Sequence, residues 1–262
     1  ALGILVVKLI GMFYKIPLTN IIGEQGNADF GNAYNIYAVL LTISTAGLPL
    51  AISKLTSQAH ARGRENEKRK IFRTAIWLFF GLGLVCSVLM FFRADALARF
   101  LNNSLAATAV QALAPAVFCV CLLACMRGYT QGQGNMTPTA VSQVLEALLK
   151  LGIGLPLAWY VLHIGKTAEL SAAGAIVGVT AGTAVSMLFL CAYLVTHWNR
   201  KESLDVPSSS GQIIKQILLI GVPITLSNSA MSIINIIDTK IVMGRLQDAL
   251  LLSEDAAAAL NG

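Results

Sequence analysis

Residues 54–92 read KLTSQAHARGRENEKRKIFRTAIWLFFGLGLVCSVLMFF and hold the two features that decide the fold. The first part is basic, because seven Lys and Arg residues lie between positions 54 and 73, against Glu65 and Glu67. The second part, residues 74–92, contains no charged residue. A helix of about 20 apolar residues crosses a hydrocarbon core about 30 Å thick, so the second part predicts a membrane span with a basic flank.

The same pattern repeats along the whole chain. Its 262 residues are 56% hydrophobic and 12% charged, with a mean hydropathy of +0.70, whereas an ordinary soluble domain has about 25% charged residues. We therefore expect an all-α, polytopic transmembrane helix bundle. Seven spans are predicted, at residues 2–22, 33–53, 73–92, 107–126, 138–162, 171–197 and 214–236.

The distribution of basic residues predicts the orientation. Lys and Arg favour the cytoplasmic side of a membrane, so we assign the basic segment 54–73 and the N-terminus to the cytoplasm. The other predicted cytoplasmic loops then hold Arg127, Arg200, Lys201 and Lys215, and the predicted outer loops hold Arg93, Arg99, Lys166, Lys240 and Arg245. This bias accounts for the net charge of +6 without a nucleic-acid partner.

A linker-like stretch divides the predicted spans. Residues 199–211 contain Pro207 followed by three serines, a composition typical of a connecting segment. We expect a first lobe of six spans at 1–197, a cytoplasmic linker at 198–213 and the start of a second lobe at 214–262. The chain begins at Ala1 and ends at Gly262 within the repeating pattern, so we expect a fragment.

Small residues favour packing roles in this sequence. All five cysteines, at positions 86, 119, 121, 125 and 191, lie in apolar stretches without accompanying His or carboxylate ligands, so no metal site is expected. In the sixth predicted span, Gly174, Gly178 and Gly182 recur every four residues and predict a close helix contact. Residues 127–134, RGYTQGQG, lack the ending of a phosphate-binding loop and predict a tight cytoplasmic turn.

The first predicted span carries a positive stripe. Lys8 and Lys15 lie seven residues apart, which is two helical turns, and Gly11 lies between them on the same face. An ionised side chain in a span costs about 2.5 to 3.5 kcal/mol, so it needs water, a partner or a function. We expect Lys15 to face a hydrated cavity, whereas Lys8 fits either that cavity or snorkelling to the cytoplasmic interface.

Polar residues also mark the fifth and seventh predicted spans. On the fifth, Glu146 and Lys150 have the spacing of an ion pair within one helix, with cavity lining as the alternative. On the seventh, below Pro223, a polar stripe predicts a water-filled pathway, although hydrogen bonds between helices could absorb part of it. The stripe consists of Thr225, Asn228, Ser232, Asn235 and Asp238.

The far end of that stripe offers oxygen ligands for a cation. Asp238 and Thr239 could hold a coupling Na⁺ or proton. Alternatively, Asp238 pairs at the outer interface with Lys240 or Arg245. The two hypotheses remain equally supported by the residues alone.

Several motifs resemble those of a known family. They are YKIPLTNIIG at 14–23, ISTAGLPLAISK at 43–54, RGY at 127–129 and MTPT at 136–139, followed by Ser142 and Gln143. They are similar to the stage V sporulation protein B branch of the multidrug/oligosaccharidyl-lipid/polysaccharide (MOP) exporter superfamily. This branch resembles the MurJ lipid II flippases, in which about fourteen helices form two lobes around a central cavity and work by alternating access.

The resemblance implies a role in cell-wall synthesis at the cytoplasmic membrane of a bacterium. We expect a flippase for an undecaprenyl-diphosphate-linked precursor, most specifically lipid II, with Lys15, Lys8, Asn228 and Asn235 contacting the substrate. A comparable acid on the seventh helix of MurJ-type flippases implies an ion site at Asp238. Related flippases often have Arg where this chain has Lys15, and a Lys acts on a diphosphate as a point charge rather than a bidentate fork.

Other functions fit the same spans. Within the superfamily, the alternatives are a flippase for another lipid-linked polysaccharide and a cation-coupled drug exporter. A membrane-bound glycosyltransferase is a weaker alternative, because His60, His163 and His197 are far apart and no catalytic set is visible. A scaffold for cell-wall synthesis enzymes is a third class. We expect no enzyme activity and no cofactor beyond the coupling ion.

Overall fold

The computed structural model describes residues 7, 10, 11, 13, 14, 17–21, 31, 47–100, 107–164, 168–198 and 203–250. The regular elements within these residues are all helical. They are α2 (Leu48–Ala61), α3 (Glu65–Phe92), α4 (Ala94–Phe100), α5 (Ala107–Gly132), α6 (Thr137–Leu149), the π-helical turn η2 (Lys150–Gly154), α7 (Leu155–His163), α8 (Ala168–Thr196) and α9 (Ser210–Leu250).

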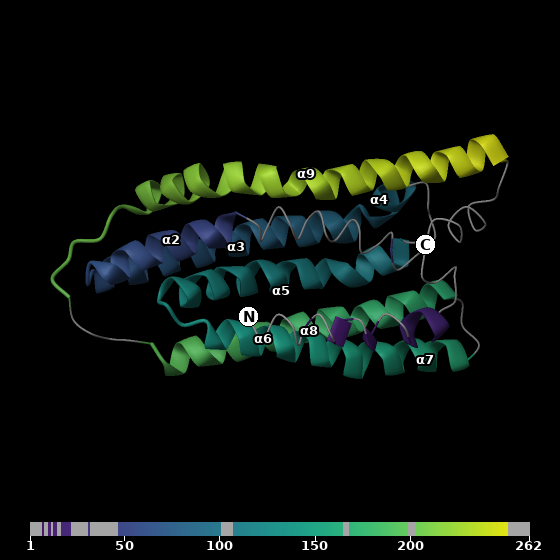
Figure 1. Cartoon of the computed structure of the whole chain (residues 1–262), viewed down its shortest axis with the longest axis horizontal. Coiled ribbons are helices and arrows are strands. Elements are labelled where there is room, and N and C mark those ends of the chain that lie inside the picture. Colours follow the sequence, from purple (N-terminus) through teal and green to yellow (C-terminus); the bar gives the residue numbers. More distant parts are fainter. Residues whose placement is uncertain are drawn as a thin grey trace.

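The long helices lie side by side along one axis. Figure 1 shows α9 along one edge of the bundle and α7 with α8 along the opposite edge, while residues 203–209 cross one end. Five helical stretches are long and apolar enough to cross a membrane, at 65–92, 107–132, 137–163, 170–196 and 210–227. These correspond to the third to seventh predicted spans, so the prediction of a polytopic helical bundle is confirmed. Most of the first two predicted spans lies outside the described residues.

The basic segment between the second and third predicted spans is helical rather than a loop. The second span was predicted to end at residue 53, but α2 continues to Ala61, and α3 begins at Glu65 instead of residue 73. Only residues 62–64 form the turn, where Gly63 has a φ of 66° that favours glycine. Hydropathy could not predict these ends, because both helices continue through charged sequence beyond their apolar parts.

The seventh predicted span is also longer than expected. It was predicted at 214–236, whereas α9 runs from Ser210 to Leu250 and includes Pro223 within the helix. A short helix, α4, occupies part of the segment predicted as an outer loop after the third span. Both differences have the same cause. α4 and the C-terminal part of α9 are helical although their sequences are too polar to be predicted as membrane spans.

Helix α5 forms the centre of the bundle and contacts α2, α3 and α8. Its C-terminal half approaches α2 so closely that a Cβ at Gly128 would lie 2.6 Å from the Pro49 carbonyl oxygen, and a Cβ at Gly132 would lie 2.6 Å from that of Ser53. The prediction of a turn over 127–134 is therefore wrong for both glycines, which belong to the helix. Only residues after 132 turn, and Gly134 there has a φ of 79°.

The glycines of α8 make the predicted helix contact. A Cβ at Gly178 would lie 2.3 Å from the Gly154 Cα, and a Cβ at Gly182 would lie 2.8 Å from the Glu146 carbonyl oxygen. Gly174 lies against Leu157. The prediction from the four-residue spacing is confirmed, since α8 packs along the whole of α6, η2 and α7.

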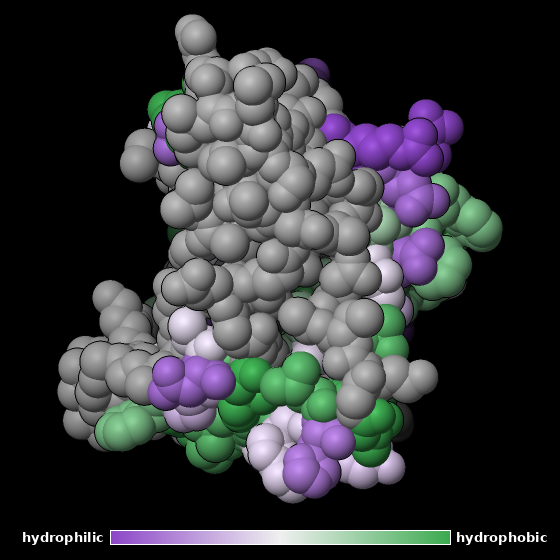
Figure 2. All heavy atoms as spheres, turned by 90° about the vertical axis from the view of Figure 1, so that its right-hand side faces the viewer, coloured by the Kyte–Doolittle hydropathy of each residue, from purple (hydrophilic) through white to green (hydrophobic). Residues whose placement is uncertain are grey.

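The outer surface of the described bundle is rich in apolar side chains. On α3, Trp77 and Phe92 are 73% and 77% exposed, and Val195 of α8 is 72% exposed. Figure 2, viewed from the end opposite residues 203–209, shows hydrophobic side chains at the surface among the described atoms. So much exposed apolar surface is typical of a protein in lipid. Cys119, Cys121 and Cys125 are buried in α5, as packing predicted, whereas Cys191 is exposed.

Candidate transport site

Some of the predicted site residues cannot be compared with the structure. Lys8 and Lys15 lie outside the described residues. Asn228, Asn235 and Thr239 are on α9, but their side chains lie outside the described part. Asp238 is exposed on the same helix. Its predicted role in a cation site therefore remains a prediction.

The first and fifth spans meet at Tyr14 and Lys150. The Tyr14 side chain is buried in a small apolar cluster that includes Ala158 and Ala175. The Lys150 Nζ atom lies 4.7 Å from the centre of the Tyr14 ring, within range of a cation–π interaction. The described residues of the first predicted span therefore lie beside the fifth.

Lys150 begins the π-helical turn η2, which the sequence did not reveal. A π-helical turn carries one extra residue relative to an α-helix and often occurs at functional sites. Here the turn ends at Gly154, which lies against Gly178 of α8 without room for a side chain on either residue. The extra residue and the tight glycine contact together hold the start of the turn, with Lys150, beside the first span.

The partner of Glu146 is on another helix. The guanidinium of Arg127, on α5, donates to the Glu146 carboxylate at 2.9 Å and to the Ser142 hydroxyl at 2.9 Å. Ser186 of α8 donates to the Ser142 carbonyl oxygen at 3.0 Å. Arg127 is thus a partner of Glu146 that the sequence did not predict, and the Glu146 charge also acts on Lys150, as the spacing of the two residues predicted. The cluster joins α5, α6 and α8.

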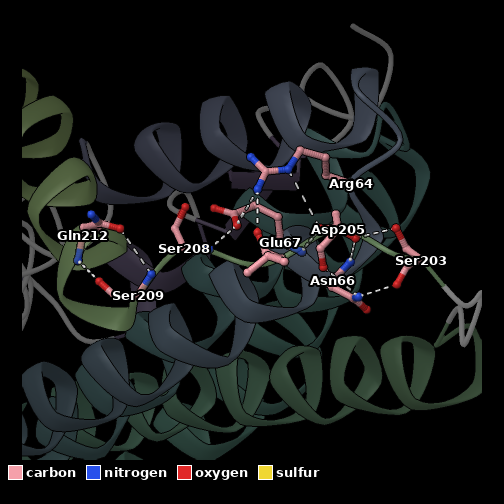
Figure 3. A network of polar contacts seen from close by, with 9 residues as sticks. Arg64, Asn66, Glu67, Ser203, Asp205, Ser208, Ser209 and Gln212 are labelled. Carbon is pink, nitrogen blue, oxygen red and sulfur yellow. Dashed lines mark hydrogen bonds and ion pairs between the residues drawn. The ribbon is translucent and has the colours of Figure 1, made fainter.

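The segment 203–209 is fastened to the start of α3, as Figure 3 shows. Arg64, at the N-cap position of α3, makes no side-chain cap. Instead, the Asp205 carboxylate accepts hydrogen bonds from the backbone N–H groups of Asn66 at 3.0 Å and Glu67 at 2.8 Å. The free N–H groups of the first helical turn are thus capped by a residue from beyond the sixth span.

Further contacts extend this fastening in both directions. Asn66 donates through its side-chain amide to the Ser203 carbonyl oxygen at 2.7 Å, and Arg64 donates to the Val206 carbonyl oxygen at 2.8 Å. The Ser208 N–H donates to the Glu67 carboxylate at 2.5 Å. Sequence reasoning missed these residues, although an Arg at the start of a long helix is a sign of a missing cap.

The environment of Asp205 favours its charged form. Burial alone would raise the pKa of its carboxyl group. Hydrogen bonds from the Ser203 hydroxyl and from the backbone N–H groups of Glu67 and Asn66 lower this pKa, and so does the nearby Arg64 guanidinium. The net effect is a pKa below the usual value for Asp. Asp205 is therefore ionised at neutral pH and can act as a charged cap.

The seventh span packs against the second at two glycines, Gly47 and Gly221, which have no side chains to separate the backbones. A Cβ at Gly47 would lie 2.0 Å from the Gly221 carbonyl oxygen, and a Cβ at Gly221 would lie 2.6 Å from the Leu48 side chain. Thr225, the first member of the predicted polar stripe, is buried in this contact. At this residue the stripe serves helix packing rather than a water-filled pathway.

This arrangement is one half of a known transporter fold. The chain superposes on a solved multidrug resistance MATE family transporter of the MOP superfamily, in its outward-facing conformation, with a TM-score of 0.73 and 21% identity. The match covers 88% of this chain and 52% of that chain. Residues 1–253 match the family described as Polysaccharide biosynthesis protein, and the chain belongs to that family. The family and the superposition thus agree with the prediction of a MOP-type helical bundle.

Two curated relatives come from Bacillus subtilis (strain 168). Stage V sporulation protein B is 29% identical over 225 residues, which are 84% of this chain and 43% of that protein. Lipid II flippase MurJ is 27% identical over 215 residues, which are 77% of this chain and 38% of that protein. The chain thus spans less than half the length of either relative. The resemblance predicted from the motifs is confirmed at the level of the superfamily.

Proposed function

We propose that this chain is the first half of a flippase that carries an undecaprenyl-diphosphate-linked cell-wall precursor, most specifically lipid II, across the cytoplasmic membrane. The observation that carries the proposal is Lys150, whose ammonium group lies between the first and fifth spans over the Tyr14 ring. A diphosphate headgroup cannot cross hydrocarbon unaided, and cationic groups between helices lower that barrier. Similarity to a lipid II flippase supports this substrate, while the family description supports lipid-linked glycans more generally.

The proposal includes an arrangement for the whole protein. Residues 1–197 form the first lobe, 198–213 the cytoplasmic linker and 214–262 the start of a second lobe. The N-terminus is cytoplasmic. Lys15, Lys8, Asn228 and Asn235 contact the substrate together with Lys150. Cell-wall synthesis enzymes are proposed partners of the complete protein.

Replacement of Lys150 tests the substrate contact. In the full-length protein, Lys150→Ala should lower flipping roughly tenfold or more, because a charged contact contributes about 1.5 to 3 kcal/mol. Lys150→Arg should keep part of the activity, and Lys215→Ala, at an exposed position on α9, is the matched control. The measurement is growth of a cell depleted of its own lipid II flippase, at equal protein levels, together with lipid II transfer in proteoliposomes. Full activity of Lys150→Ala would refute the substrate contact.

The coupling ion is tested separately. If Asp238 and Thr239 bind Na⁺ or a proton, Asp238→Asn should insert normally but lose the dependence of transport on the cation gradient, since the amide keeps the size and removes the charge. Transport in proteoliposomes with and without the gradient measures this. An unchanged dependence would leave Asp238 as an interfacial acid.

A further inference from the structure

An open groove lies between α3 and the beginning of α9, at the end of the bundle where residues 203–209 cross. It has a volume of about 540 Å³ and is lined by Lys70, Arg73 and Trp77 of α3 and by Ser210 and Ile214 of α9, among others. Positions 70, 73 and 77 are three and four residues apart, so their side chains share one face of α3. The groove therefore presents two cations and an indole ring in a row.

The charges of the groove match an anion. Among the residues that the structure describes, neither Lys70 nor Arg73 forms an ion pair, whereas Arg64, Lys68 and Arg127 do. Arg73 is exposed and Lys70 is partly exposed. The backbone N–H groups at the beginning of α9, next to Ser210, add to the positive potential of the two side chains.

The surface beyond the cations matches a hydrocarbon chain. Trp77 is exposed at the next turn of α3, and Trp side chains are enriched at the level of lipid headgroups. Farther along, Phe80 and Leu84 of α3 and Leu218 of α9 are exposed apolar side chains. The order of cation, indole and apolar side chain is the order of phosphate, ester region and acyl chain in a phospholipid.

We propose that this groove binds one anionic phospholipid from the leaflet at this end of the bundle, with its phosphate between Lys70 and Arg73 and an acyl chain along Trp77. In the proposed orientation this is the cytoplasmic leaflet, but the binding itself does not depend on that orientation or on the proposed substrate. Basic grooves between membrane helices on the cytoplasmic side are suited to anionic headgroups. Because the lipid touches α3 and α9 together, it stabilises their contact.

The test compares two double variants of the full-length protein. Lys70→Gln/Arg73→Gln removes both cations of the groove, and Lys54→Gln/Arg62→Gln removes two exposed cations at the same end of the bundle but outside the groove. Native mass spectrometry measures how much phosphatidylglycerol each protein retains from mixed micelles that also contain phosphatidylcholine. At about 1 kcal/mol for each basic residue, the groove variant should bind phosphatidylglycerol about 30-fold more weakly, while the control variant and phosphatidylcholine binding change little.

The remaining outcomes distinguish the groove from its alternatives. Lys70→Arg/Arg73→Lys, which keeps both charges, should retain the preference for phosphatidylglycerol, and an unchanged elution volume in gel filtration shows that each variant is folded. Equal losses in the groove and control variants would overturn the proposal, because they would indicate attraction to general surface charge. Displacement of phosphatidylglycerol by an equimolar amount of undecaprenyl phosphate would also overturn it, since the groove would then favour a polyprenyl lipid.

Discussion

Asp205 accepts a hydrogen bond from the backbone N–H of Glu67 at 2.8 Å, although the two residues are 138 positions apart in the chain. Together with the bond from Asn66, this contact gives the first turn of α3 a cap that its own sequence lacks. The segment between the sixth and seventh spans is thereby tied to the segment between the second and third. Two connections that hydropathy treats as independent loops form one structure.

Removal of this cap should destabilise both the first turn of α3 and the segment 203–209. Replacing a capping side chain by alanine costs about 1 kcal/mol, so Asp205→Ala should raise the hydrogen-exchange rate of the Asn66 and Glu67 amides roughly fivefold. Residues 203–209 should also be cleaved faster by a protease. Asp95→Ala, which removes an exposed acid at the other end of the bundle, is the control and should change neither. Equal exchange in the Asp205→Ala and unmodified proteins would contradict the capping role.

The lowered pKa of Asp205 predicts how this fastening depends on pH. A carboxyl group whose pKa is lower in the folded protein contributes stability above its unfolded pKa of about 3.9 and loses that contribution as the pH falls through the folded value. Protection of residues 203–209 should therefore stay constant from pH 7 to about pH 5 and weaken only in stronger acid. Hydrogen exchange corrected for intrinsic rates measures this. The acid-induced loss should be absent in Asp205→Asn.

The contact between Gly47 and Gly221 should tolerate no side chain. Gly47→Ala places a methyl group against the Gly221 carbonyl oxygen and must move α9 away from α2. Overpacking of this kind costs about 1 to 3 kcal/mol, so the melting temperature of the full-length protein should fall by several degrees. Gly81→Ala is the matched control, because nothing lies within 4 Å of the added methyl group. Similar melting temperatures for the two variants would mean that α2 and α9 separate without cost.

The pair between Arg127 and Glu146 should show coupled energetics. Their side chains are 18% and 27% exposed, so the pair is only partly screened by water. In a double-mutant cycle, Arg127→Ala and Glu146→Ala should each destabilise the protein, and the double variant should be more stable than their sum predicts by about 1 kcal/mol. As a control, the effects of Arg62→Ala and Glu146→Ala should be additive, because in the described structure Glu146 pairs with Arg127 and not with Arg62. A coupling free energy near zero would mean that this ion pair does not stabilise the contact between α5 and α6.

The membrane orientation can be tested directly by cysteine labelling. In a cysteine-free background, a cysteine in place of the exposed Arg62 should not react with an impermeant reagent added outside intact cells, because the basic α2–α3 turn resists translocation. It should react after the membrane is permeabilised. Labelling in intact cells would reverse the proposed orientation.

The parts of the fold that the sequence predicted are those that depend on one helix at a time. Span positions follow from runs of apolar residues, and the close approach along α8 follows from the spacing of Gly174, Gly178 and Gly182. Helix ends were less predictable, because α2, α3 and α9 continue through polar sequence once their apolar parts are anchored. The π-helical turn at Lys150 was not predicted, because residues 150–154 lie inside one predicted span and hydropathy does not distinguish a π-turn from an α-helix.

The contacts that the sequence did not predict are those between segments far apart in the chain. Glu146 has Lys150 at a favourable spacing on its own helix, yet Arg127 reaches it from α5, and only the packing of the two helices could reveal this. The same is true of Asp205, whose partners precede it by more than 130 residues. The contact between Tyr14 and Lys150 was likewise not predicted, because it joins two spans that are far apart in the sequence.

The fastening of residues 203–209 limits how α9 can move. Because the fastened residues directly precede Ser210, we expect the start of α9 to stay beside the start of α3 when the helix tilts. With 41 residues at about 1.5 Å each, α9 is about 60 Å long. A tilt of only about 10° would then carry its far end through about 10 Å while its first turn remained nearly still. Asp205 thus lies at the end of the bundle where such a tilt would move α9 least, and the largest movement would occur at the opposite end of the bundle.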